Sequence, residues 1–234
     1  MEQRNKVLMM LTSHDRMDST TDKTGVWLGE MTDPYYELLD AGFEVTMCSP
    51  LGGAPPVDPM SKLTEHITAS NRRFLADETA QQSFENTLSM ENVKASAFDA
   101  VFIAGGHGPL WDLARHPHVG RILCEFVDQE KPIAAVCHGP AALFAMEACR
   151  PGYLNARRLT SFTNMEESIV MRKDNIPYEL ETRLVENGAD FSHAVVPFMP
   201  HVVLDENLIT GQNPLSAAPA ARTLIELIRF PKPL

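Results

Sequence analysis

A cysteine at the end of an apolar run is the residue of this sequence best suited to covalent chemistry. Residues 134–140 read A-A-V-C-H-G-P, and a helix-compatible stretch, 141–148, follows. A strand, a nucleophile and a helix in this order are typical of a nucleophile elbow. The free N–H groups at the start of such a helix favour the thiolate of Cys137, and Gly139 leaves space where two backbone segments approach. We therefore predict that Cys137 is a reactive nucleophile.

Glycines after another apolar run could complete the same site. Residues 105–108 read G-G-H-G and follow a buried run, 98–104. These glycines have two interpretations. They can mark a tight turn and nothing more, or they can let backbone N–H groups approach a ligand, as an oxyanion hole requires. We predict that the backbone N–H of Gly106 or His107, together with that of His138, holds a developing oxyanion.

Three carboxyl groups near these segments have more than one interpretation. By its residue type alone, Glu30 is a solvated surface carboxylate before the first predicted helix. Glu166 and Glu167 form an acidic pair after a predicted strand, and such pairs are usually solvated. One of them could instead orient the His138 imidazole, as an acid does in a Cys–His catalytic pair. The remaining histidines do not have metal-ligand spacing, so we expect no metal site: His14, His66, His116, His118, His193 and His201.

The alternation of strand-like and helical stretches predicts the sheet that must position these residues. Such alternation favours an α/β fold with a mostly parallel sheet and helices on both faces. Functional groups in these sheets lie at the carboxyl ends of the strands. The predicted strands are residues 6–11, 43–48, 98–104, 132–136, 158–162, 193–198 and 202–209. The predicted helices are 34–41, with Asp33 as N-cap and Gly42 as the stop, 119–129, 141–148, 178–187, and 216–228 with Ser216 as N-cap.

One segment, residues 51–91, breaks the alternation. It begins with G-G-A-P-P-V-D-P after Leu51 and continues as polar sequence with a helical bias over 71–88. We interpret it as an excursion from the sheet, so that residues 1–234 form a single domain.

Composition and charge limit the possible partners and the cellular compartment. A formal net charge of −11 disfavours nonspecific binding to nucleic acid. The apolar run near the N-terminus is too short for a membrane span or a signal segment, so we expect a cytoplasmic protein and no membrane contact. In that compartment thiols stay reduced, and the cysteines show no C-x-x-C spacing. We therefore expect no disulfide among Cys48, Cys124, Cys137 and Cys149.

Seven blocks of this sequence carry a family resemblance. The chain resembles the DJ-1/PfpI superfamily, relatives of class I glutamine amidotransferases, and within it the branch of the glyoxalase III and heat-inducible chaperone proteins. The blocks are T-G-V-W-L-G-E (24–30), D-P-Y-Y (33–36), S-P-L-G-G-A-P-P-V-D-P (49–59), F-D-A-V-F-I-A-G-G-H-G-P-L-W-D-L (98–113), A-A-V-C-H-G-P (134–140), S-F-T-N-M-E-E (161–167) and L-I-T-G-Q-N-P (208–214).

The resemblance implies a flavodoxin-like α/β sandwich, usually dimeric, and a role for each candidate residue. Cys137 matches the nucleophile, His138 the triad histidine, and Glu167 the acid that orients it. Glu30 matches a buried carboxyl beside the cysteine, which replaces the surface interpretation. A carboxyl held against a thiolate must be protonated, so its pKa should be raised. Gly106 and His138 match the oxyanion donors.

The function implied by this resemblance is a cofactor-independent cysteine enzyme for small reactive carbonyls. A glyoxalase III-type conversion of methylglyoxal to lactate, or a related deglycase activity, is the first expectation, and a homodimer is the expected assembly. A PfpI-type intracellular peptidase or amidase would use the same thiol and oxyanion hole. A stress-responsive holdase chaperone or a thiol redox sensor is the alternative of another class.

Overall fold

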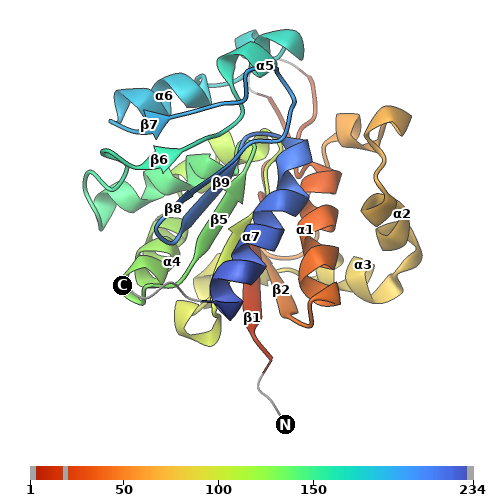
Figure 1. The fold of residues 1–234 in the computed structure, drawn as a ribbon. Coiled ribbons are helices and arrows are strands. Elements are labelled where there is room, and N and C mark those ends of the chain that lie inside the picture. The colour runs from red at the N-terminus through yellow and green to blue at the C-terminus, as the bar shows by residue number, and fades with distance from the viewer. Residues whose placement is uncertain (1–3, 18–20, 231–234) are drawn as a thin grey trace.

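The core of the fold is a seven-stranded sheet, seen in the computed structural model, which describes residues 4–17 and 21–230 (Figure 1). The strand order is β3-β2-β1-β4-β5-β9-β8, and all neighbours are parallel except β8 and β9. The mostly parallel α/β class is therefore confirmed. The strands are β1 (Lys6–Met10), β2 (Glu44–Ser49), β3 (Leu88–Ser89), β4 (Ala100–Ile103), β5 (Ile133–Val136), β8 (Val202–Asp205) and β9 (Leu208–Gly211).

Helices cover both faces of the sheet, and each face closes over its own apolar cluster. On one face α1 (Leu28–Asp40) packs beside α7 (Ala217–Arg229), with α2 (Ala69–Ala76) and α3 (Glu78–Glu85) outside α1 (Figure 1). The other face is covered by α4 (Pro117–Asp128) and by η7 (Gly139–Ala148), a run of 3₁₀ turns. Successive residues of β1 alternate between the two clusters. Burial on both faces explains why the central strands are continuous apolar runs in the sequence.

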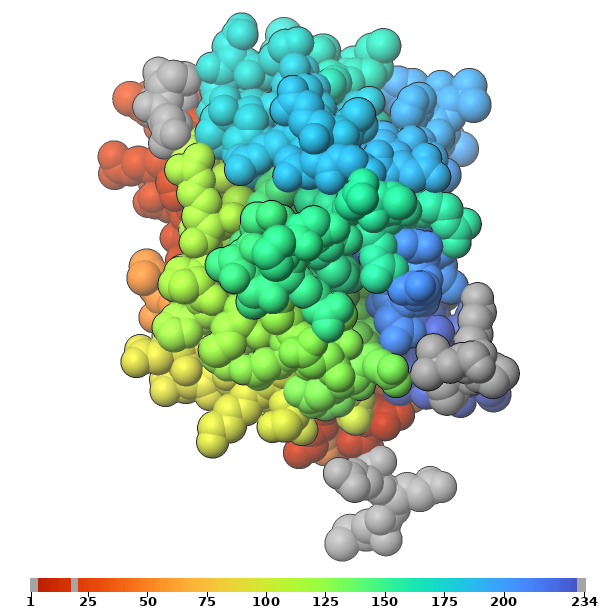
Figure 2. Space-filling view, turned by 90° about the vertical axis from the view of Figure 1, so that its left-hand side faces the viewer, coloured from red at the N-terminus to blue at the C-terminus, as the bar shows by residue number. Residues whose placement is uncertain are grey.

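A smaller layer covers the carboxyl ends of the central strands. It contains β6 (Arg158–Leu159), α5 (Asn164–Ile169), α6 (Leu180–Glu186) and β7 (Asp190–Phe191), and β6 pairs with β7 in a separate parallel sheet. In Figure 2 the later part of this layer, cyan to light blue, forms the top of the molecule above the green surface of α4 and η7. Short 3₁₀ turns complete the chain: Pro59–Lys62, Thr64–His66, Met90–Asn92, Ala95–Ala97, Gly108–Leu110, Leu113–Arg115, Lys173–Asn175 and Pro214–Ser216.

The first helix begins earlier than the sequence predicts. The N-cap assigned to Asp33 is wrong, because α1 begins at Leu28 and contains Pro34. Proline lacks the N–H that would bond the carbonyl of Glu30, four residues earlier. Burial of the apolar side chains of α1 against the sheet outweighs that one missing hydrogen bond. The predicted stop is confirmed, since Gly42 follows the C-cap with a φ of 89°.

The strand predictions near the C-terminus are partly wrong. Residues 193–198 form no strand, and 158–162 is extended only at β6, outside the main sheet. The predicted single strand 202–209 is the hairpin of β8 and β9, because Glu206 turns the chain with a φ of 54°. The helical bias over 71–88 corresponds to α2 and α3, and the excursion then returns to the sheet as β3.

A disulfide joins Cys124 on α4 to Cys149 just after η7, so the prediction of four reduced cysteines is wrong. The two residues are 25 positions apart, and only the packing of α4 on η7 brings them together. Cys48 and Cys137 are free and buried. Within the described ranges, no helix combines the length and apolar character needed to cross a bilayer.

Candidate active site

The predicted elbow is formed where β5 ends. Cys137 is buried and has a φ of 59°, a left-handed conformation that is strained for a residue with a side chain. Two hydrogen bonds hold it: its N–H donates to the carbonyl of Gly211 at 2.8 Å, and its carbonyl accepts from the N–H of Phe162 at 2.9 Å. A Cβ on Gly139 would lie 2.7 Å from the carbonyl oxygen of Ile103, so the turn requires glycine there. The backbone therefore fixes where the thiol points.

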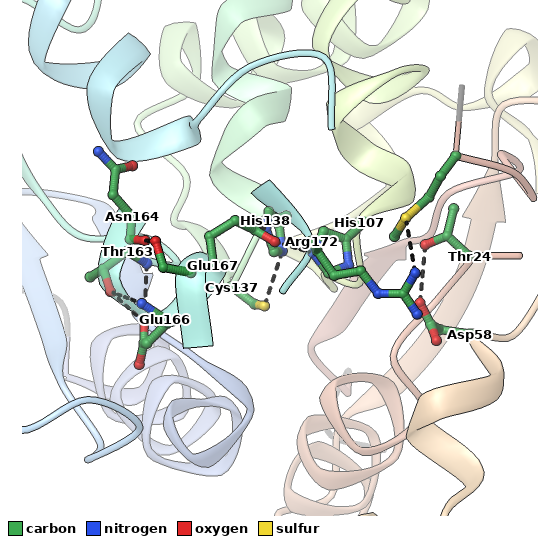
Figure 3. Close-up of polar contacts among 12 residues, drawn as sticks. Thr24, Asp58, His107, Cys137, His138, Thr163, Asn164, Glu166, Glu167 and Arg172 are labelled. Carbon is green, nitrogen blue, oxygen red and sulfur yellow. Dashed lines mark hydrogen bonds and ion pairs between the residues drawn. The ribbon is translucent and has the colours of Figure 1, made fainter. Parts of the chain in front are cut away.

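Three side chains form a chain of hydrogen bonds that starts at the thiol (Figure 3). Cys137 Sγ lies 3.3 Å from His138 Nδ1, and His138 Nε2 lies 2.8 Å from Glu167 Oε2. A carboxylate can only accept, so Nε2 carries the hydrogen and Nδ1 presents a lone pair to the thiol. Burial, together with the neighbouring His107, lowers the pKa of His138. The imidazole is therefore neutral at neutral pH and can take the thiol proton.

Glu167 has a second imidazole partner that the sequence analysis did not find. His107 Nε2 lies 2.8 Å from Glu167 Oε1, and the His107 ring lies 4.2 Å from that of His138. Burial raises the pKa of Glu167, but the two histidines lower it by more. The pKa of Glu167 is therefore held below its usual range. The sequence pointed to His107 only through its backbone, because nothing local indicates a partner 60 residues away.

The neighbouring acid, Glu166, is buried and has a structural position. Its Oε2 accepts from the N–H and hydroxyl of Thr163, each at 3.0 Å. Its Oε1 accepts from the N–H of Phe198 at 2.8 Å and from the amides of Gln212 and Asn213, both at 2.9 Å. The structure therefore brings Glu167, and not Glu166, to His138.

Glu30 lies in the first turn of α1 and is fully buried, so its interpretation as a surface residue is wrong. Burial raises the pKa of Glu30 to about 8, and the nearby Cys137 and backbone N–H groups of Gly105 and Gly106 offset this only in part. Neither carboxyl oxygen has a partner at full hydrogen-bond geometry. The raised pKa expected of this carboxyl is confirmed, and it is mainly protonated at neutral pH.

The thiol itself is not activated in the resting site. Burial, followed by the charge of Glu30, raises the pKa of Cys137 well above its ordinary value. The predicted thiolate is therefore wrong for the resting state, because desolvation raises the pKa of Cys137 by more than the backbone N–H of Gly106 lowers it. Proton transfer to His138 has to accompany attack by the sulfur.

Gly106 has the backbone geometry that its predicted role needs. Its φ is 87°, and a Cβ there would collide with the carbonyl oxygen of Gly25. Its N–H acts to lower the pKa of both Cys137 and Glu30, so it is directed toward the reacting group. The assignment of Gly106, His107 and His138 as oxyanion donors stays a prediction.

These residues line a cavity of about 400 Å³. Trp27, Phe162 and Phe198 contribute aromatic surface to it. Arg172 also lines it and forms an ion pair with Asp22. The other lining residues are Gly29, Glu30, Asp33, Asp58, Met60, Glu65, His66, Ile67, Thr68, Gly106, His107, Cys137, His138, Val170, Asn213, Pro214 and Leu215.

Comparison with known proteins places this geometry in a family. The model of the DJ-1/PfpI family matches residues 23–227. The chain belongs to the DJ-1/PfpI family. Over 96% of its length it is 29% identical to the glutathione-independent glyoxalase HSP31 of Saccharomyces cerevisiae, of which the match covers 98%.

Two solved structures resemble this DJ-1/PfpI chain over nearly its whole length. One is the Rapid Encystment Protein 24 KDa of Francisella tularensis, with 35% identity, a TM-score of 0.89, and coverage of 96% of this chain and 99% of the other. The second is glyoxalase III of Candida albicans, with 26% identity, a TM-score of 0.83, and coverage of 94% of this chain and 96% of the other.

One cluster of this DJ-1/PfpI site also has metal-ligating potential. His107, His138 and Glu167 each offer one ligand atom, and the three atoms lie within 4.8 Å of one another. Sequence spacing did not reveal the cluster, because its members come from three separate segments. The two nitrogen–oxygen distances of 2.8 Å are those of hydrogen bonds, which account for the arrangement.

Proposed function

We propose that this chain is a glutathione-independent glyoxalase that converts methylglyoxal to lactate. The observation that carries the proposal is the position of one thiol, Cys137, between a neutral imidazole and a protonated carboxyl in a single cavity. An internal redox conversion of a 2-oxoaldehyde needs a nucleophile and groups that move protons, and these residues supply both. The names of HSP31 of Saccharomyces cerevisiae and glyoxalase III of Candida albicans support the same reaction.

The first step is addition of the thiol to the aldehyde. Cys137 Sγ forms a bond to the aldehyde carbon while its proton passes to His138 Nδ1, 3.3 Å away. The aldehyde oxygen becomes an oxyanion, which the backbone N–H groups of Gly106 and His138 stabilise. Protonation of that oxygen gives a hemithioacetal, and Glu167 keeps the imidazole in the required tautomer.

The second step moves hydrogen between the two carbons of the substrate. His138 removes the proton from the former aldehyde carbon while the protonated Glu30 carboxyl gives its proton to the ketone oxygen, which leaves an enediol. His138 then returns its proton to the former ketone carbon, and the hydroxyl proton of the first carbon passes back to Glu30. The first carbon is oxidised to a thioester and the second is reduced to an alcohol, so no external oxidant or reductant is required. Water then cleaves the thioester, which releases lactate and restores the thiol of Cys137.

The test is lactate formation from methylglyoxal without glutathione. We expect the wild-type protein to form lactate and Cys137→Ala to lose turnover, because no intermediate can form. Cys48→Ala is the matched control, since Cys48 is the other free cysteine and lies buried in β2, outside the cavity lining. Lactate formation by Cys137→Ala, or none by the wild-type protein, would contradict the proposal.

The state of the thiol bears on the redox-sensor alternative. Peroxide oxidises exposed thiolates of low pKa most readily. Cys137 is buried and its pKa is raised, so its environment favours a thiol that reacts with a bound electrophile over one that senses peroxide.

The assembly and the compartment complete the proposal. From the family resemblance we infer one domain over residues 1–234, a homodimer and a cytoplasmic enzyme. The Cys124–Cys149 disulfide removes one argument for that compartment, since cytoplasmic thiols are normally reduced. A dimeric mass by light scattering and recovery of the protein in the cytoplasmic fraction of cells would support these inferences. A monomer or recovery in another compartment would contradict them.

A further inference from the structure

The cavity beside Cys137 is larger than the substrate of the proposed reaction. Its volume is about 400 Å³, within the roughly 300–1,000 Å³ typical of pockets that bury drug-sized ligands. Methylglyoxal has only three carbons and two oxygens, so the cavity has room beyond the reacting atoms.

The unused space is bordered by apolar side chains that lead away from the catalytic imidazole. The Phe162 ring lies 4.8 Å from that of His138 and 6.1 Å from that of Phe198. Val170 at the end of α5 and Leu215 in the 3₁₀ turn before α7 also line the cavity. An extended substituent on the substrate would exchange water for contact with these side chains.

The charged groups of the lining disfavour an anionic substituent. Asp33, Asp58 and Glu65 line the cavity and would repel an anionic group. Arg172 is the arginine among the lining residues, and its guanidinium is already engaged with Asp22. A carboxylate or phosphate on the substrate would have to share that guanidinium with Asp22.

We infer that the cavity selects neutral 2-oxoaldehydes whose ketone carries an apolar chain longer than methyl, with Phe162, Phe198, Val170 and Leu215 contacting the chain. This inference rests on the proposed glyoxalase function. It adds a specificity that the relatives' names do not state.

A homologous series of substrates tests the inference. The series is 2-oxopropanal (methylglyoxal), 2-oxobutanal, 2-oxopentanal and 2-oxohexanal, whose aldehydes have nearly the same intrinsic reactivity. We expect kcat/KM to rise by up to about fourfold for each added CH₂ group, the full value of burying one methylene. A flat or falling series would overturn the inference.

Two variants locate the effect in the cavity. Phe198→Ala and Leu215→Ala should each reduce the gain per CH₂ group and leave the rate with methylglyoxal less affected. Val195→Ala is the matched control, because Val195 is on the same loop as Phe198, is 97% exposed and does not line the cavity. Melting curves by circular dichroism verify that the variants fold. An unchanged gain in both cavity variants would overturn the inference.

The outcomes separate this inference from the proposed function. If no member of the series is converted, the glyoxalase function itself fails. If methylglyoxal is converted but chain length has no effect, only the inference fails. Faster conversion of a 2-oxoaldehyde with a terminal ammonium group than of its alkyl counterpart would overturn the neutral character and assign the site to cationic substituents.

Discussion

Replacement of Glu30 by glutamine should change how the stability of this protein depends on pH. Burial raises the pKa of the Glu30 carboxyl from 4.5 to about 8 in the folded chain. Between these values the folded state holds a proton that the unfolded state has lost, so the free energy of unfolding falls as pH rises. Each pH unit costs about 1.4 kcal/mol, which amounts to about 3.5 kcal/mol at pH 7 and approaches about 5 kcal/mol above pH 8. The whole free energy of unfolding of a native protein is only about 5–15 kcal/mol.

The variant Glu30→Gln keeps the shape of the protonated carboxyl and cannot ionise. The free energy of unfolding of the variant minus that of the wild type should therefore rise by up to about 5 kcal/mol between pH 4.5 and 8. Urea unfolding followed by circular dichroism at each pH unit measures this difference. Comparing slopes with pH removes any constant cost of burying the glutamine amide.

A second variant separates the effect of burial on the pKa of Glu30 from the effect of the neighbouring Cys137 thiol. Burial is the largest cause of the raised pKa of Glu30, ahead of every contribution from Cys137. Cys137→Ala should therefore keep most of the wild-type pH dependence. A difference between Glu30→Gln and wild type that stays constant from pH 5 to 8 would refute the reasoning, because Glu30 would then be ionised or solvated in the folded protein.

Three further predictions concern the surroundings of the site. His107→Gln removes a neighbour that lowers the pKa of His138. In a plot of kcat/KM against pH, the acid limb should therefore move to higher pH. An unmoved limb would mean that the His107 ring has no electrostatic effect on His138. Glu166→Gln replaces one acceptor oxygen by an amide group, so buried donors such as the N–H of Phe198 lose a partner. The free energy of unfolding in urea should fall by about 2 kcal/mol or more. Equal unfolding midpoints for variant and wild type would contradict this. Cys149→Ser opens a loop of 25 residues and should lower the free energy of unfolding by about 3.5 kcal/mol. Reductant should bring the wild type to the same midpoint but leave the variant unchanged.

The central strands could be predicted from the sequence because they are buried on both faces. Such strands are apolar runs whatever surrounds them, and β1, β2, β4 and β5 lie within a residue or two of their predicted ends. Residues 193–198 have a similar composition but form an irregular loop. The loop is held by the carboxyl of Glu166, which accepts from the N–H of Phe198 in place of a strand partner. Composition does not reveal which backbone groups will find a neighbouring strand.

The site divides in the same way between local and distant information. The sequence by itself determined the elbow, because Cys137, His138 and Gly139 are adjacent and the turn depends on local backbone geometry. Tertiary structure alone decided the second partner of Glu167 and the main cause of the raised pKa of Glu30, which is burial. A pKa depends on how much water the fold removes, and the His107 hydrogen bond joins residues 60 positions apart. The disulfide between α4 and the end of η7 has the same origin, since only helix packing brings its two cysteines together.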